Sequence, residues 1–138
     1  MPKISVLIPA YINNKKELKL FSSLSGRHAR RKTNLCLCEG LKACVELFRL
    51  RLDLIQRAFF SGEHIPEEIF PGLKLEEISN EQMKRISPSV SPQGIIMILR
   101  RPQFANFADF LPEKNSFVVA LDKIQDPGNL GTMIRTLK

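Results

Sequence analysis

Apolar residues recur every three or four positions in two stretches of the chain, residues 15–24 and 41–52, which is the spacing of an amphipathic helix. Gly26 ends the first of these helices. Short apolar runs predict strands, and the last of them is the strongest: residues 35–38, 53–60, 73–78 and 95–99. The wholly apolar run at 35–38 indicates a strand that is buried on both faces.

Helix-capping and turn-forming residues between these runs support the same division into helices and strands. Pro66 opens a short acidic helix, and Ser79 with Gln82 three residues later has the spacing of a capping box for a helix that ends near Ile86. Residues 87–94 hold serines, prolines and a glycine, a composition typical of a loop. Strands that alternate with helices predict one α/β domain with a largely covered sheet.

The last part of the chain follows a different pattern. Residues 102–116 are predicted to form a linker, and the run Phe117–Leu121 predicts another buried strand, followed by a loop and a helix that begins near Asn129. A single strand and one short helix cannot cover both faces of a sheet, so these residues require a partner surface. Either the first domain covers them, or another chain does, or the sequence is a fragment of a longer protein, and we favour the fragment.

Charge is the first composition value that points to a partner. The 138 residues carry a net charge of +7, and the first 60 residues hold 12 of the 21 basic side chains but only 4 of the 14 acidic ones. Such a basic half predicts a polyanion-binding surface, with nucleic acid as the first candidate and an anionic membrane surface as the second. No apolar run is long enough to span a bilayer, and no signal sequence is evident, so we expect a cytoplasmic protein.

The densest basic segment is predicted to bind RNA. Residues 27–34 hold four permanent cations within six positions and are expected to be too charged to pack. Such side chains mainly meet phosphates, with little reading of sequence. The alternative is a solvated basic loop without a ligand. The RNA-contact candidates are Arg27, His28, Arg30, Arg31 and Lys32.

The cysteines do not indicate a metal or disulfide framework. Cys36, Cys38 and Cys44 are odd in number and lie in or beside apolar runs, and their spacing lacks the Cys-x-x-Cys pair common in zinc sites. We expect three buried thiols and no metal site.

The most specific string in the chain is residues 125–136, which read Gln-Asp-Pro-Gly-Asn-Leu-Gly-Thr-Met-Ile-Arg-Thr. Pro127 and Gly128 suit a tight turn, and Asn129 is a good helix N-cap. A helix N-terminus favours an anion, and Arg135 is a fork-shaped donor suited to phosphate oxygens. The alternative is an ordinary capped turn with a surface arginine.

This string resembles the first signature motif of the SpoU (TrmH-type) RNA methyltransferases of the SPOUT superfamily, which is roughly Asp-Pro-x-Asn-x-Gly-x-x-x-Arg. The matching residues are Asp126, Pro127, Asn129, Gly131 and Arg135. Upstream, the basic segment, Leu-Cys-Glu-Gly at 37–40 and Ser-Pro-Gln-Gly-Ile-Ile-Met-Ile at 91–98 resemble the small RNA-binding domain that precedes the catalytic domain in many of these enzymes.

The resemblance implies a fold and a division of the chain. It implies a small α/β/α sandwich, similar to an RNA-binding ribosomal protein, at residues 15–101 after an N-terminal extension at 1–14. Residues 117–138 would then be the first strand and helix of an incomplete, knotted SPOUT domain. The family's second and third motifs, which build the knot, the cofactor site and most of the dimer contact, have no counterpart in the sequence.

The resemblance also implies an activity, namely methylation of a ribose 2′-hydroxyl of ribosomal or transfer RNA with S-adenosylmethionine, by a homodimer. Asn129 and Arg135 would be the catalytic residues. Arginine is a poor base, so its role would be to orient phosphate and to stabilise charge on the ribose oxygen. No residue is assigned to the cofactor, and the chain alone is expected not to methylate RNA. The alternatives are a non-catalytic RNA-binding module and, last, attachment to a membrane surface.

Overall fold

The computed structural model describes residues 15–62, 65, 67–103, 108 and 114–137. The predicted N-terminal extension, residues 1–14, lies outside the described residues, as does most of the predicted linker. The chain divides into two units, and the boundary between them along the sequence follows Gln103. No described helix has the length and apolar character needed to cross a membrane.

A four-stranded sheet forms the centre of the first unit, in the order β1-β4-β2-β3. Its strands are β1 (Leu35–Glu39), β2 (Ile55–Phe60), β3 (Glu76–Glu77) and β4 (Ile95–Arg100). The central strand β4 is antiparallel to both neighbours, whereas the two-residue β3 runs parallel to β2. The mixed α/β fold predicted from the sequence is confirmed.

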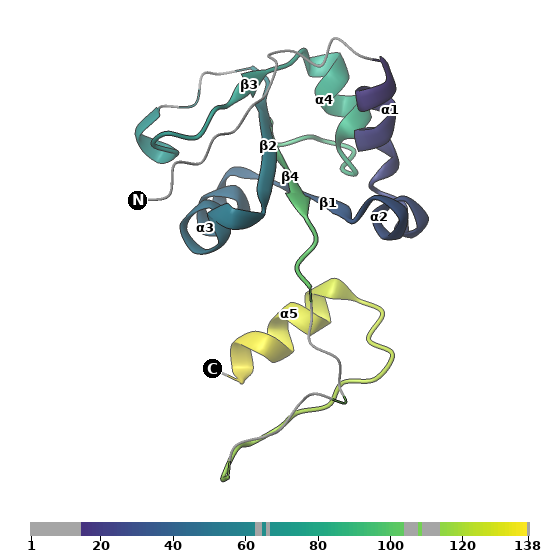
Figure 1. Ribbon diagram of the computed structural model, residues 1–138, viewed down its shortest axis with the longest axis vertical. Helices are drawn as coiled ribbons and strands as arrows, with labels where there is room; N and C mark the ends of the chain where they lie inside the picture. Colours follow the sequence, from purple (N-terminus) through teal and green to yellow (C-terminus); the bar gives the residue numbers. More distant parts are fainter. Residues whose placement is uncertain (1–14, 63–64, 66, 104–107, 109–113, 138) are drawn as a thin grey trace. The chain divides into compact units, whose positions relative to one another are not determined.

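Helices cover both faces of this sheet (Figure 1). The helical elements of the first unit are α1 (Lys15–Ser23), α2 (Arg27–Thr33), α3 (Leu41–Arg51), α4 (Asn80–Ile86) and the 3-10 turns η1 (Leu52–Leu54) and η2 (Glu67–Ile69). Helices α1, α2 and α4 lie on one face, and α3 with the two turns lies on the other.

The two cores follow from the alternation of side chains along β4. Ile96 and Ile98 point to one face, where they pack with Phe21 of α1 and Met83 of α4. The residues between them, such as Met97, point to the other face and pack with the cysteine and phenylalanine side chains of the α3 layer. A strand whose successive side chains enter two cores is apolar throughout, which explains the unbroken run at 95–99.

Two strand predictions for the first unit need correction. β1 is half-buried rather than buried on both faces, because it lies at the edge of the sheet and pairs only with β4. The predicted strand at 73–78 is reduced to the two residues of β3, since its leucines pack into the α3-side core instead of continuing the pairing. The capping box is confirmed: Ser79 Oγ accepts from Gln82 N at 3.1 Å, and Gln82 Oε1 accepts from Ser79 N at 3.1 Å.

The basic segment is a helix, so the prediction that it is too charged to pack is wrong. Helix α2 follows Gly26 directly and ends at Asn34, which adopts a left-handed conformation with φ of 57°. Ala29 packs against the core, and Thr33 Oγ1 donates to its carbonyl at 2.8 Å. Three cations in the last turn suit the negative end of the helix dipole, which favours the helix.

In the second unit, the predicted strand at 117–121 is wrong. These residues form no strand, and Phe117 and Val118 are 86% and 50% exposed, because no described strand pairs with them. Helix α5 (Pro127–Thr136) is present, but its N-cap is Asp126 and not Asn129. The Asp126 side chain accepts from Gly128 N at 2.7 Å, and Pro127 occupies the first turn, where a missing N–H costs nothing.

A candidate RNA interface and candidate catalytic residues

Helix α2 presents most of the predicted RNA-binding residues to solvent. Arg27, His28, Arg31 and Lys32 are exposed. Within the described residues, no carboxylate forms an ion pair with Arg27, Arg31 or Lys32. These three neighbouring cations create a positive surface, because no described acid neutralises them. A bound polyanion would reduce the repulsion between them.

Arg30 differs from its neighbours because its guanidinium is used within the fold. Its Nη1 donates to the carbonyl oxygens of Leu24, at 2.9 Å, and of Ser25. These carbonyls follow the end of α1, so the contact fixes the turn between α1 and α2. The structure thus gives Arg30 a role in placing the helix that displays the other cations.

The loop at 87–94 is held to the end of β1 by the carboxylate of Glu39. This carboxylate accepts from Ser87 Oγ at 2.9 and 3.0 Å and from Gln93 N at 3.1 Å. Gly40 follows with φ of 97°, and a Cβ there would overlap the side-chain oxygen of Gln93. The residues of the Glu-Gly and Gln-Gly motifs therefore meet in space and hold the loop, although they are more than 50 residues apart.

The two candidate catalytic residues lie on α5, and both are exposed. On an ideal helix, Asn129 and Arg135 are about 9 Å apart along the axis and roughly 120° apart around it. No hydrogen bond joins them in the described structure; Arg135 Nη2 instead donates to Thr132 Oγ1 at 3.2 Å. The Arg135 guanidinium also lies over Gly131, where an added Cβ would be 3.3 Å from its Nη1. The sequence prediction did not include Thr132, which the helical period places between the two candidates.

The cysteines are free thiols, and one is enclosed in the core. Cys44 is buried, and its Sγ donates to the Cys38 carbonyl at 3.7 Å. Cys36 and Cys38 are half-buried, so only one of the three thiols that were expected to be buried is fully buried. The contact with Cys38, together with burial, raises the pKa of Cys44, so this thiol is not a nucleophile at neutral pH. The described residues contain no group of three or more side chains that could hold a metal ion.

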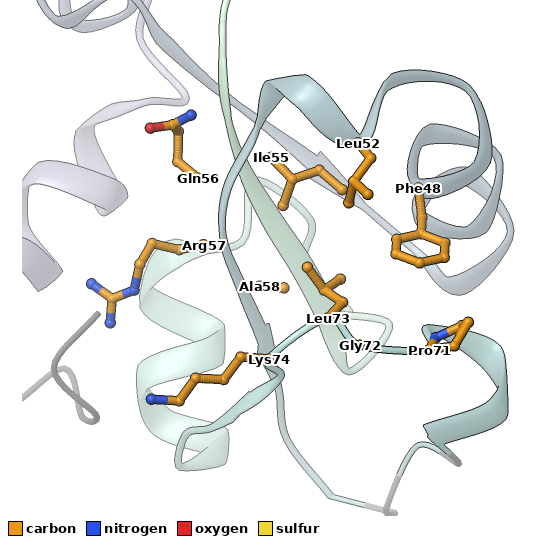
Figure 2. Close-up of a pocket in the computed structure, with 10 residues that line it drawn as sticks. All are labelled: Phe48, Leu52, Ile55, Gln56, Arg57, Ala58, Pro71, Gly72, Leu73 and Lys74. Carbon is orange, nitrogen blue, oxygen red and sulfur yellow. The ribbon is translucent and has the colours of Figure 1, made fainter. Parts of the chain in front are cut away.

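A groove of about 280 Å³ opens between α3, β2 and the loop before β3. Figure 2 shows Phe48, Leu52 and Leu73 around it, with Arg57 and Lys74 extending away from these apolar side chains. The Arg57 guanidinium donates to the carboxylates of Glu76 and Glu17 and extends away from the groove (Figure 2). None of the residues predicted to bind RNA or to act in catalysis lines it.

The chain matches known RNA-modifying proteins along most of its length. Residues 15–97 match the family model described as the MRM3-like substrate binding domain. The chain is 28% identical to the 23S rRNA (guanosine(2553)-2′-O)-methyltransferase RlmP of Bacillus subtilis (strain 168), over 88% of this chain and 46% of the relative. It is 25% identical to the mitochondrial rRNA methyltransferase 3 of Homo sapiens, over 92% of this chain and 32% of that protein.

The solved structures that resemble this chain are also RNA methyltransferases. The AdoMet-bound rRNA methyltransferase from Sinorhizobium meliloti superimposes with a TM-score of 0.64 at 27% identity, over 93% of this chain and 49% of that one. An RNA 2′-O ribose methyltransferase superimposes with a TM-score of 0.65 at 23% identity, which supports the fold. The chain thus spans half or less of the length of these proteins. The resemblance to SpoU-type RNA methyltransferases is confirmed, and the chain belongs to the MRM3-like substrate-binding domain family.

Proposed function

We propose that this chain binds structured RNA and forms part of an RNA ribose 2′-O-methyltransferase of the SpoU (TrmH) type that acts on ribosomal or transfer RNA. One observation carries the proposal: residues 15–97 match a substrate-binding domain, and in that domain α2 displays cations that no described carboxylate pairs with. The names of the relatives, which are rRNA methyltransferases, support RNA as the substrate class.

In this proposal α2 binds the RNA backbone. Arg27, Arg31 and Lys32 are exposed on a helix of seven residues, so their side chains can meet phosphates on a structured RNA without unfolding the protein. Contacts of this kind are strongly salt-dependent and carry little sequence information. Arg30 acts as a positioning residue, since it joins α2 to the end of α1.

The proposed catalytic assignment rests on the motif and on the exposure of α5. A ribose hydroxyl is a weak nucleophile that must lose its proton during attack. The Arg135 guanidinium stays protonated, so it would stabilise negative charge on that oxygen and orient an adjacent phosphate rather than remove the proton. Asn129 would hold the hydroxyl or the loop by hydrogen bonds. Thr132, which accepts from Arg135, would fix the direction of the guanidinium.

S-adenosylmethionine would supply the methyl group in such an enzyme. The proposal assigns the cofactor no residue of this chain. The homodimer and the cytoplasmic location remain predictions.

The proposal is tested by measuring the binding of a fluorescently labelled ribosomal RNA fragment to the 138-residue chain between about 50 and 200 mM salt. The double variant Arg27→Ala/Arg31→Ala should bind severalfold more weakly at low salt, because two phosphates no longer meet a cation. A charge-matched variant, Lys42→Ala/Arg49→Ala, removes two exposed cations of α3 and should bind as the unmodified chain does. Equal binding by all three proteins would contradict the proposal.

A second measurement separates the enzyme from a non-catalytic RNA-binding module. Titration calorimetry with S-adenosylmethionine, and transfer of a labelled methyl group to ribosomal and transfer RNA, report on the methyltransferase directly. Methyl transfer that Arg135→Ala diminishes supports the catalytic assignment. Because the chain alone is expected not to methylate RNA, cofactor binding is the discriminating result, and RNA binding without cofactor binding favours the RNA-binding module instead.

A further inference from the structure

The two helical layers of the first unit differ sharply in charge. Helix α1 carries three lysines and one glutamate, α2 carries four cations, and α4 carries two cations and one glutamate. On the other face of the sheet, α3 with η1 and η2 carries three cations and four acidic residues. Figure 1 shows that α1 and α4 lie beside each other on the same face as α2. Among the helical layers of this domain, the net positive charge is therefore on the α1-α2-α4 face.

A groove between α1 and α4 gathers part of this charge. Its lining is Lys15, Leu18, Lys19 and Ser22 of α1 together with Arg85 of α4. The groove has a volume of about 480 Å³. Lys15, Lys19 and Arg85 are exposed, so their charged ends can reach a group that sits in the groove.

No described ion pair joins the acids on these helices to the cations of the groove. Glu17 of α1 lies between Lys15 and Lys19 in sequence, but its Oε1 accepts from Arg57 Nη1 of β2 at 3.3 Å. Glu81 of α4 precedes Arg85 by one helical turn, yet no described ion pair joins them. The three cations of the groove therefore have no described ion-pair partner.

The arrangement is unfavourable for the free protein. Lys15 and Lys19 are four residues apart on one helix, where like charges are destabilising. An anion in the groove would relieve this repulsion, whereas a neutral or cationic ligand would not.

We propose that the groove between α1 and α4 is a second phosphate-binding site for the RNA, separate from the α2 cations, so that the RNA backbone crosses the α1-α2-α4 face and leaves the α3 face free. This inference rests on the proposed function, because it takes RNA as the partner. The ligand class is a phosphodiester group, which Lys15, Lys19 and Arg85 bind through charge-assisted hydrogen bonds.

The test compares two charge-neutralised double variants of the full 138-residue chain. Lys19→Gln/Arg85→Gln removes two cations of the groove, and Lys42→Gln/Arg49→Gln removes two exposed cations of α3 as the matched control. Binding of one fluorescein-labelled RNA hairpin is measured from about 50 to 200 mM salt. The groove variant should reduce the magnitude of the slope of log K against log salt by about one for each phosphate that is no longer neutralised, and the control should leave it unchanged.

The outcomes separate this inference from the proposed function. If the unmodified chain binds the hairpin and the groove variant keeps its affinity and salt slope, the second site is overturned while RNA binding through α2 stands. If the unmodified chain binds no RNA at low salt but binds vesicles that contain phosphatidylserine, both proposals are overturned. Melting by circular dichroism checks folding, and if the double variant melts early, the single variants Lys19→Gln and Arg85→Gln give the same comparison.

Discussion

The ion pair between Arg57 and Glu76 should be the polar interaction whose loss destabilises the first unit most. The Arg57 Nε and Nη2 atoms donate to the two Glu76 carboxylate oxygens at 2.6 and 2.7 Å, and the two side chains are only 11% and 4% exposed. The guanidinium carbon also lies 5.0 Å from the centroid of the Phe59 ring. The hydrogen bonds to Glu76 raise the pKa of Arg57, so the guanidinium stays charged throughout the accessible pH range.

We expect Arg57→Ala to lower the free energy of unfolding by about 3–5 kcal/mol, because the Glu76 carboxylate is left buried without its partner. Small domains lose about 1–3 kcal/mol of stability per molar urea, so the unfolding midpoint should fall by roughly 2 M. The chain contains no tryptophan and one tyrosine, so far-ultraviolet circular dichroism is the suitable signal for the urea titration.

Two further variants test whether burial sets the cost. Arg51 and Asp53 form a similar two-bond pair, with both distances 3.0 Å, but their side chains are 49% and 58% exposed. Arg51→Ala should therefore leave the midpoint close to that of the unmodified chain. Arg57→Met/Glu76→Met replaces both charges with apolar groups and should recover most of the loss. Equal losses for Arg51→Ala and Arg57→Ala would refute the reasoning.

Two local predictions can be checked with the same titration. Gly40→Ala and Gly62→Ala should lower the midpoint by similar amounts, because both glycines have positive φ and the added Cβ at Gly40 meets only the far end of the Gln93 side chain, which can shift; a much larger loss for Gly40→Ala would show that this side chain is fixed. Ser79→Ala should cost about 1 kcal/mol by removing the capping box of α4, while Ser79→Thr should retain most of the stability; a neutral alanine variant would contradict the role of the cap.

The sequence predicted best those elements whose signal is local. The capping box at Ser79 is complete within four residues, and β4 is an unbroken apolar run because each face of the sheet has its own core. Helix α2 was missed because its charge suggested solvation, although Gly26 and Asn34 supply its ends and Ala29 its contact with the core. A single alanine on an otherwise charged helix leaves no hydrophobic period to detect.

Contacts between distant parts of the chain could not be predicted. Arg57 and Glu76 are 19 residues apart and meet only because β3 pairs with β2 beside them. The groove between α1 and α4 likewise joins lysines near residue 15 to an arginine at residue 85, so the sequence showed a basic half but not the face on which the charges gather. The candidates Asn129 and Arg135 came from a motif, and their roles remain proposals.

The candidate catalytic helix places a further physical requirement on the protein. Along α5, Leu130, Met133, Ile134 and Leu137 form one apolar stripe, and all four are at least 37% exposed. An isolated helix of ten residues is marginally stable in water, whereas each such side chain contributes about 1.5–3 kcal/mol when it is fully buried. The opposite stripe holds the Arg135 side chain against Thr132. Whatever surface covers the apolar stripe therefore also sets the direction of the guanidinium, so the role proposed for Arg135 depends on that packing as much as on the motif itself.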